Sequence, residues 1–124
     1  MNKVKISIWG REFDIDVRYS CYPGEEITQT QKEAVNEFCA SNDITVDSIN
    51  KVKDYIANAS DSNLKVIDIE NIFKYVMPKY LYVPRTDKRV IAVMCNFKFD
   101  TENGIAVVYK NERFEEIGEQ DIVL

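Results

Sequence analysis

The sequence predicts an α+β domain in which a largely antiparallel sheet carries its helices on one face. Residues 3–19 alternate apolar and polar side chains around a Gly10-Arg11 turn, which is the pattern of a β-hairpin. Residues 28–76 carry apolar side chains at helical spacing, and residues 90–117 return to strand patterns separated by short turns. Strands and helices that are segregated along a chain favour the α+β class. We expect a single domain over residues 1–124.

The N-terminal hairpin should place one face on a core and the other in water. The apolar residues of the core face are Val4, Ile6, Ile8, Phe13, Ile15, Val17 and Tyr19. The outer face of the second arm carries Asp14 and Asp16. Trp9 lies beside Arg11 at the turn, where it either packs as a strand end or forms an exposed contact site of the kind common at protein interfaces.

Two or three helices should follow the hairpin. The first begins at a capping box near residues 28–30 and ends at Ser41-Asn42. The second runs from about residue 46 to 59, because its apolar residues recur at three-and-four spacing. A short third helix would begin at Asp68 and stop before Pro78, because proline cannot continue a helix.

The last third of the chain predicts a three-stranded antiparallel meander. Residues 90–99 form a long strand that is apolar on both faces as far as Cys95, so it should lie inside the sheet with cover on both sides. The turn Asp100–Gly104 leads into a return strand over residues 105–109, and a third strand follows over residues 113–117.

The chain contains no histidine, which is the commonest general base, the usual activator of serine and cysteine nucleophiles, and a common metal ligand. The three cysteines, Cys21, Cys39 and Cys95, are odd in number and far apart, which argues against a disulfide framework and against a zinc site. We expect buried free thiols, or a reactive Cys21 in its loop, and neither a metal nor a cofactor. No segment resembles a signal peptide or a membrane span, so we expect a cytoplasmic protein without membrane contact.

The net charge of −5 is unevenly distributed along the chain. Residues 12–61 contain eleven acidic and four basic side chains, a net charge of −7, whereas residues 65–89 carry a net charge of +3. An acidic surface disfavours nonspecific binding to phosphate backbones and favours a basic protein partner. We therefore expect no nucleic-acid ligand.

Two pairs of carboxylates leave a catalytic alternative open. Asp14 and Asp16 would lie about 7 Å apart on one strand face, a separation compatible with acid–base chemistry on a sugar. Asp100 and Glu102 share the last hairpin turn, where they either shape the turn or present carboxylates to a partner. Two carboxylates alone would hold a hard cation only weakly.

The residues from Phe99 to Val108, followed by Phe114 to Asp121, are similar to an uncharacterised family of small bacterial domains. That family carries an aromatic-Asp-x-Glu-His-Gly-apolar-Gly-Val turn and a final Val-Gly-x-x-Asp, and some of its members resemble immunity proteins of bacterial toxin systems. This chain departs from the pattern at Asn103, where the family has histidine, and at Ala106, where glycine is usual. The resemblance implies a binding function, and any role that needs the family histidine is absent here.

Size, acidity and this resemblance together predict a noncatalytic immunity protein that neutralises a cognate toxin domain by covering its active cleft. The partner would be a basic, nuclease-like domain that meets an acidic surface. The carboxylates expected at that surface are Glu25, Glu26, Asp47, Asp54, Asp100 and Glu102. The alternatives are a small carboxylate-dependent enzyme and a module that dimerises through a sheet edge or through the apolar face of the long strand.

Overall fold

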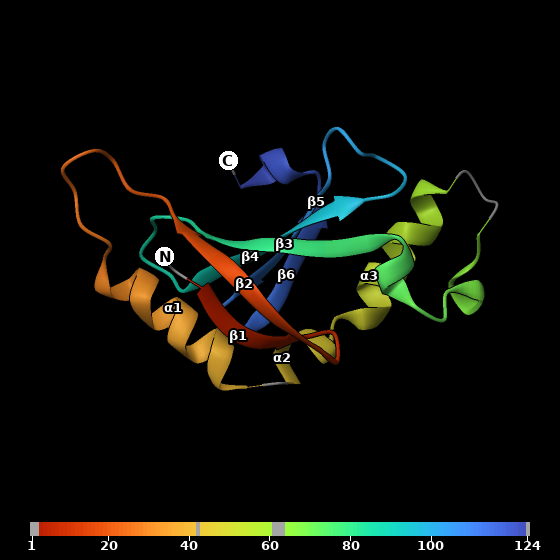
Figure 1. The fold of residues 1–124 in the computed structure, drawn as a ribbon, viewed down its shortest axis with the longest axis horizontal. Coiled ribbons are helices and arrows are strands. Elements are labelled where there is room, and N and C mark those ends of the chain that lie inside the picture. The colour runs from red at the N-terminus through yellow and green to blue at the C-terminus, as the bar shows by residue number, and fades with distance from the viewer. Residues whose placement is uncertain (1–2, 42, 61–63, 124) are drawn as a thin grey trace.

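A single six-stranded sheet organises the protein (Figure 1), whose computed structural model describes residues 3–41, 43–60 and 64–123. The strands lie side by side in chain order and are β1 (Lys3–Ile8), β2 (Arg11–Tyr19), β3 (Val76–Val83), β4 (Val90–Phe97), β5 (Ile105–Lys110) and β6 (Arg113–Gly118). The α-helices are α1 (Gln29–Ala40), α2 (Asp43–Val46) and α3 (Ile49–Ala59). Short 3-10 turns are η1 (Val66–Asp68), η2 (Ile72–Lys74) and η3 (Gln120–Ile122). The predicted α+β class is confirmed.

The pairing of the strands is antiparallel except at one junction. β1 and β2 form the predicted hairpin, and β3 to β6 form a continuous antiparallel meander. The helices lie in the connection between β2 and β3, and these two strands run parallel over only four residue pairs, Asp16–Tyr19 with Tyr80–Val83. The hairpin therefore joins the rest of the sheet through a short seam.

The main core lies between the sheet and the helices, as the hydrophobic pattern predicts. The apolar stripe of α1 is buried at Ala34, Val35 and Phe38, and that of α3 at Val52 and Ile56. The Phe38 ring lies 5.2 Å from the ring of Tyr109 in β5. Full burial of a side chain of this size stabilises the fold by about 2–3 kcal/mol.

The opposite face of the sheet is covered over its C-terminal strands only. Ala92 and Met94 of β4 lie with Ala106 and Val108 of β5 in a second buried cluster, against which Val123 packs. β4 is therefore buried on both faces, which confirms the prediction for the long apolar strand. The other half of this face, over β1, β2 and the outer side of β3, is open. No helix in the described part of the chain is long and apolar enough to cross a membrane.

The helix predicted over residues 46–59 begins at Ile49 instead, and a separate four-residue helix, α2, precedes it across a corner. The Ser48 hydroxyl donates to the Thr45 carbonyl at 2.7 Å, which ends α2, and Ser48 is completely buried at the start of α3. A serine that bonds its own preceding turn competes with continuation of a helix. The corner brings the Thr45 and Ser48 hydroxyls into the core.

The short third helix predicted before Pro78 is wrong. Asn71 caps a single 3-10 turn, and β3 begins at Val76 with Pro78 inside it, so the meander has four strands rather than three. Proline lacks the N–H that a strand ladder needs, but a β-bulge between Pro78 and Tyr80 accommodates it. Because the bulge inserts one residue, it also changes which side chains of β3 face outward.

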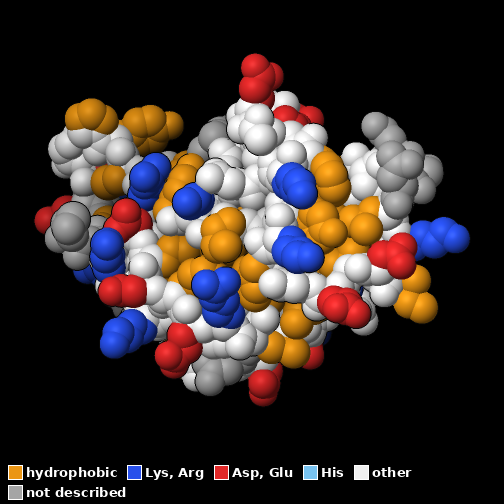
Figure 2. Space-filling view, turned by 45° about the vertical axis from the view of Figure 1, so that its right-hand side comes forward, with side chains coloured by type: hydrophobic (Ala, Val, Ile, Leu, Met, Phe, Trp, Pro, Cys, Tyr) orange, Lys and Arg blue, Asp and Glu red, His pale blue; other side chains and the backbone are white. Residues whose placement is uncertain are grey.

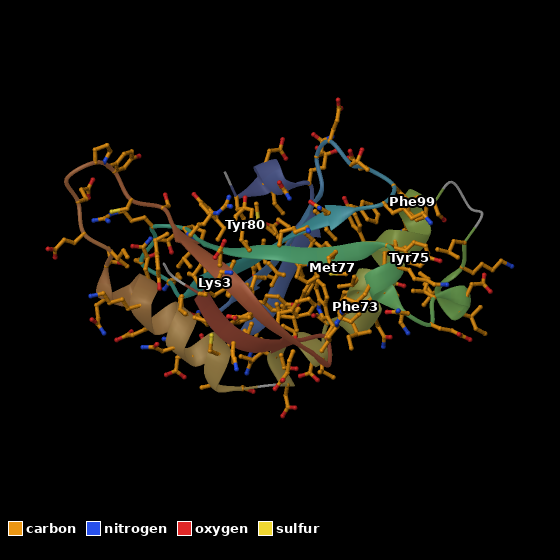
Figure 3. All side chains as sticks on the ribbon, viewed as in Figure 1. Lys3, Phe73, Tyr75, Met77, Tyr80 and Phe99 are labelled. Atoms are coloured by element: carbon orange, nitrogen blue, oxygen red, sulfur yellow. The ribbon has the colours of Figure 1, made fainter. Side chains whose placement is uncertain are left out.

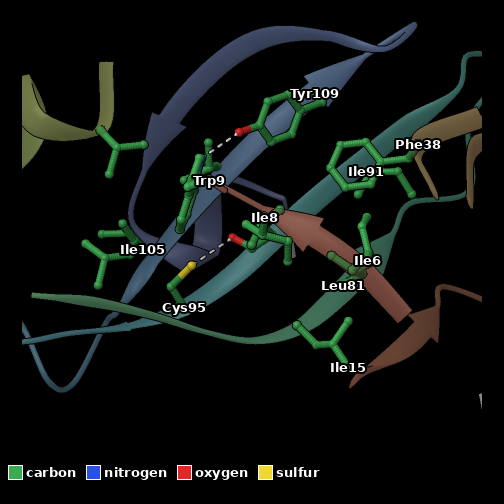
Figure 4. Close-up of a cluster of buried hydrophobic side chains, with 14 of the residues drawn as sticks. Ile6, Ile8, Trp9, Ile15, Phe38, Leu81, Ile91, Cys95, Ile105 and Tyr109 are labelled. Carbon is green, nitrogen blue, oxygen red and sulfur yellow. Dashed lines mark hydrogen bonds between the residues drawn. The ribbon is translucent and has the colours of Figure 1, made fainter. Parts of the chain in front are cut away.

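Trp9 is buried, so the prediction of a packed strand end is confirmed and an exposed contact site is excluded. Its backbone has a φ of +51°, and Gly10 follows with a φ of +83°, which together make a tight two-residue turn. The Trp9 N–H donates to the Thr45 hydroxyl at 2.9 Å, and the indole N–H donates to the Tyr109 hydroxyl at 3.2 Å (Figure 4). These bonds hold an unfavourable backbone conformation in place.

Gln31 joins α1 to the parallel seam. Its side-chain oxygen accepts from the Thr28 N–H at 2.9 Å, completing the predicted capping box. Its side-chain nitrogen donates to the carbonyls of Ser20, at 2.9 Å, and Val83, at 3.1 Å. Gln31 is 1% exposed, so one buried amide satisfies three backbone groups where the seam ends.

Candidate functional site

The six carboxylates predicted to bind a partner do not form one surface. Glu25 and Glu26 follow β2, beside the end of β3, whereas Asp100 and Glu102 follow β4, whose Phe97 pairs with Val76 at the start of β3. β3 has eight residues, so the two groups lie at opposite ends of a strand about 23 Å long. Figure 1 shows the two loops at opposite ends of the sheet.

Glu25 and Glu26 belong to the loop between β2 and α1. Arg85 binds this loop through both residues. The Arg85 guanidinium pairs with the Glu25 carboxylate at 2.7 Å and donates to the Glu26 backbone carbonyl at 2.9 Å. Both glutamates are exposed. The charge of Glu25 is therefore compensated within the chain.

Asp47 and Asp54 lie on the helical layer, at the corner before α3 and on its exposed side. Tyr55, the neighbour of Asp54, packs its ring 5.7 Å from that of Phe97 at the end of β4. Burial raises the pKa of Tyr55, and the carboxylates of Glu119 and Asp100 raise it further. Two carboxylates from different turns therefore act on the same side chain of α3.

The turn Asp100–Gly104 is held by its own residues. The Asp100 carboxylate accepts from the Asn103 backbone N–H at 3.1 Å and from the Asn103 side-chain amide at 3.1 Å. Asn103 thus braces the turn through both its backbone N–H and its side-chain amide. Asp100 is consequently a structural residue of the turn, whereas Glu102 is exposed.

Gly104 allows the C-terminal turn η3 to approach the hairpin turn between β4 and β5 closely. Its φ is +58°, and a Cβ there would lie 2.6 Å from the Cys95 carbonyl oxygen and 2.6 Å from the Gln120 side-chain nitrogen. The Gln120 amide donates to the same Cys95 carbonyl at 3.0 Å. The close contact fixes η3, and with it Glu119, against the hairpin turn. We refer to Asp100, Glu102 and Glu119 as the acidic end.

The pair Asp14 and Asp16 lies on the open outer face of β2, opposite Lys5 and Lys3 of β1. A small open groove of about 210 Å³ is lined by Lys5, Glu12, Phe13 and Asp14, so in the described structure Asp16 is not part of it. The two carboxylates therefore face basic neighbours on an exposed sheet and do not share a cleft.

A larger groove of about 440 Å³ lies between the β3–β4 loop, β5, β6 and η3. Val90 and Val108 provide apolar surface, and Lys88, Lys110 and Glu116 contribute charges of both signs. None of the predicted site carboxylates lines this groove. Among the described residues, no three Cys, Asp or Glu side chains gather closely enough to hold a metal ion.

All three cysteines are free thiols, as predicted, but they differ in exposure. Cys95 is completely buried and Cys39 is half-buried, and burial raises the pKa of both thiols, that of Cys95 strongly. Cys21 is exposed, so of the two alternatives left open by the sequence, burial of all three thiols is wrong and an accessible Cys21 in its loop remains. Its thiol lies 2.9 Å from the Glu25 carbonyl oxygen.

The aromatic side chains that accompany β3 were not predicted from the sequence. Met77 faces outward before the bulge in β3, and Tyr80 and Tyr82 face outward after it. Tyr75 precedes the strand and packs against the main core; Figure 3 labels it together with Met77 and Tyr80. Phe99 stacks on Tyr75, with ring centroids 5.6 Å apart, and is 39% exposed. We call these five residues, four aromatic side chains and Met77, the aromatic row. Odd-numbered and even-numbered residues share one face only because the bulge changes the alternation, so no regular spacing marked them.

Comparison with known proteins gives one result that covers the whole chain. No curated protein and no solved structure matches it. A family model described as a domain of unknown function (DUF6985) matches residues 1–124. The chain therefore belongs to this DUF6985 family.

Proposed function

We propose that the protein is a noncatalytic immunity protein that neutralises a cognate bacterial toxin domain in the cytoplasm. The toxin domain would be basic and nuclease-like, and the immunity protein would cover its active cleft. The proposal rests on the acidic end, where the hairpin turn that carries Asp100 and Glu102 is hydrogen-bonded to Gln120, the residue after Glu119. The similarity of residues 99–121 to a bacterial family with immunity-like members also supports it.

The acidic end is suited to binding because its backbone is already ordered. Asn103 braces the hairpin turn through Asp100, and Gln120 fixes the neighbouring turn through the Cys95 carbonyl. A surface that is rigid before binding loses little conformational entropy on association. Its negative charge would attract a basic cleft over long range and accelerate the encounter.

The predicted acids take different parts in this proposal. Glu102 and Asp54 are exposed and have no structural bond among the described residues, so we assign them to direct partner contact. Asp100 holds the turn and contributes mainly through its charge. Glu25 and Glu26 lie at the far end of β3 and serve as a comparison group rather than as part of the same contact.

The test is coexpression in bacteria with the catalytic domain of a toxin encoded beside this chain. We expect the wild-type protein to restore growth, and growth arrest despite its expression would refute the proposal. Binding of the purified toxin domain should then be measured at low and high salt by stopped-flow fluorescence. The double variant Glu102→Gln/Glu119→Gln, which removes two exposed charges of the acidic end, should slow association by about tenfold at low salt.

The matched control is Glu25→Gln/Glu26→Gln, which removes the same number of charges at the opposite end of the sheet. It should leave association within about twofold of wild type. Equal slowing by both double variants would show that only net charge matters, and would remove the acidic end from the proposal.

A further inference from the structure

We propose that Asn103 and Gly104 form a site of spontaneous deamidation, which Asp100 holds in check as long as the turn between β4 and β5 is closed. The only co-reactant is water. The inference concerns a covalent change in the chain itself and does not depend on the toxin hypothesis. It rests on the Asn-Gly pair in the sequence and on the hydrogen bonds that both reacting residues donate to Asp100.

In this reaction the backbone nitrogen of Gly104 attacks Cγ, the side-chain carbonyl carbon of Asn103. The bond between this nitrogen and Cγ forms, and the bond from Cγ to the amide nitrogen breaks. Ammonia leaves with the proton that the Gly104 nitrogen gives up, and a five-membered succinimide ring remains. Water then opens the ring at one of its two carbonyls, which leaves either aspartate or isoaspartate at position 103. The balance is an amide and water giving an acid and ammonia, without an oxidant or a reductant.

Gly104 makes Asn103 the asparagine that should react fastest in the unfolded chain. Ring closure brings the next backbone nitrogen onto the asparagine side chain, and a residue without Cβ obstructs this movement least. Every other asparagine in the sequence precedes a residue that has a side chain. Asn111 is the closest match, because it is also exposed in a hairpin turn, but Glu112 follows it.

The turn that contains the site is accessible to water. Figure 2 shows it projecting at the top of the molecule, with acidic side chains at its tip. Asn103 is exposed, whereas Gly104 is buried. The fold therefore shields the attacking nitrogen and leaves the amide that it attacks open to solvent.

In the closed turn, Asp100 accepts hydrogen bonds from both reacting groups. The Gly104 N–H donates to the Asp100 backbone carbonyl at 3.0 Å, so the nitrogen retains the proton that it has to lose. The Asn103 side-chain nitrogen donates to the two Asp100 carboxylate oxygens at 3.1 and 3.3 Å, and the Asn103 backbone N–H donates to one of them at 3.1 Å. The attack therefore requires the turn to open, and its rate in the folded chain follows the small population of opened turns.

The products do not fit back into the closed turn. An aspartate at position 103 has no side-chain N–H to donate, and it would place a second carboxylate where the Asn103 amide now lies 3.1 Å from that of Asp100. An isoaspartate would lengthen the main chain by one carbon directly before Gly104, where even an added Cβ would lie 2.6 Å from the Cys95 carbonyl oxygen. The change is therefore one-way, and it loosens the contact that fixes η3.

The test follows the full chain in warm, mildly alkaline buffer, either folded or in urea, with the deamidation of each asparagine measured by peptide mass spectrometry. We expect conversion in urea to be fastest at Asn103, and conversion of the folded chain to be at least about tenfold slower there, because only opened turns react. Asp100→Ala should accelerate conversion in the folded chain about fivefold or more, because it removes the carboxylate to which Asn103 donates. It should leave conversion in urea unchanged.

The matched control is Thr101→Ala, which truncates an exposed side chain of the same turn. It should leave the rate at Asn103 in the folded chain within about twofold of wild type. Asn111 provides an internal control, because it should keep its amide longer in the same samples. Circular dichroism should show that each variant is folded in the absence of urea.

A second measurement isolates the effect of the added charge. Asn103→Asp and Asn103→Ala both lose the side-chain bond to Asp100, but only Asn103→Asp adds a like charge beside it. The urea midpoint of Asn103→Asp should therefore be the lower of the two.

Three results would overturn the inference. Conversion in urea that is no faster at Asn103 than at Asn111 would remove the site. Equal rates at Asn103 in the folded and unfolded wild type, or no acceleration by Asp100→Ala, would remove the protective role of Asp100. A urea midpoint of Asn103→Asp at or above that of Asn103→Ala would show that the product is accepted in the closed turn, and the change would then not loosen it.

Discussion

Replacement of Gly104 by alanine should destabilise the protein by about 3–6 kcal/mol. A left-handed backbone costs about 1–2 kcal/mol for a residue with a Cβ, and Gly104 has a φ of +58°. The added Cβ would lie 2.6 Å from both the Cys95 carbonyl oxygen and the Gln120 side-chain nitrogen, so one of them must move. Loss of the bond between these two groups costs about 1 kcal/mol, and overpacking costs about 1–3 kcal/mol more.

Gly24 provides the matched control because it separates backbone strain from crowding. Its φ is +85°, but nothing lies within 4 Å of the position of an added Cβ. Gly24→Ala should therefore cost only the backbone term of about 1–2 kcal/mol. Urea unfolding followed by the fluorescence of Trp9, the single tryptophan, measures both variants.

A third variant identifies the crowded neighbour. Gln120→Ala alone should cost about 1 kcal/mol, because it removes one partly buried hydrogen bond. The double variant Gly104→Ala/Gln120→Ala should lose less stability than the two single variants lose together, because the Cβ at position 104 no longer meets the Gln120 amide. If Gly104→Ala costs within about 0.5 kcal/mol of Gly24→Ala, the close-approach argument is refuted.

Four further outcomes follow from buried polar groups and thiols. Gln31→Met should cost about 2–4 kcal/mol in urea unfolding, because it removes the side-chain donor to the Ser20 carbonyl, the acceptor of the Thr28 N–H, and one of two donors to the Val83 carbonyl. The exposed neighbour Gln29→Met should change stability by less than about 0.5 kcal/mol. Tyr109→Phe should cost about 1–2 kcal/mol, because the Tyr109 hydroxyl lies 2.6 Å from the Ser48 hydroxyl; an unchanged urea midpoint would contradict this. Titration with a thiol reagent should detect Cys21 quickly, Cys39 slowly and Cys95 only after unfolding, and fast reaction of all three in the native state would contradict their burial. Burial raises the pKa of Cys95 and of Tyr109 above the values of the unfolded chain. Stability is therefore full below the unfolded pKa values and falls as pH rises above about 9, because the unfolded chain then releases these protons first. The urea midpoint should fall above this pH, and it should fall less steeply in Tyr109→Phe.

The elements that the sequence predicted well are those whose signal is local. The capping box at Thr28 and the apolar stripe ending at Phe38 defined α1, and alternation around Gly10 defined the first hairpin. β3 escaped prediction because Pro78 argues against a strand and the bulge after it breaks the period of two. The bulge forms where β3 pairs with β4, and the local sequence of β3 does not reveal this pairing.

For the candidate sites too, the sequence predicted the residue types but not how far apart the fold places them. The sequence named Asp100 and Glu102 correctly as turn carboxylates, but it grouped them with Glu25 and Glu26, which β3 holds at the opposite end of the sheet. Because β3 was not predicted, the distance between these two groups of carboxylates could not be inferred from the sequence. The aromatic row was missed for the same reason, because Arg18 meets Tyr80 only across the parallel seam.

The parallel seam also has a consequence for the newly made chain on the ribosome. The first hairpin is synthesised early, yet its only other neighbour in the sheet is β3, and the paired residues Asp16 and Tyr80 are 64 positions apart. Until translation has passed Val83, β2 lacks its second neighbouring strand, β3. During that time, α1 is the element that can cover the apolar face of the hairpin. Lys3 and Lys5 on the exposed strand β1 would then discourage edge-to-edge pairing between nascent chains.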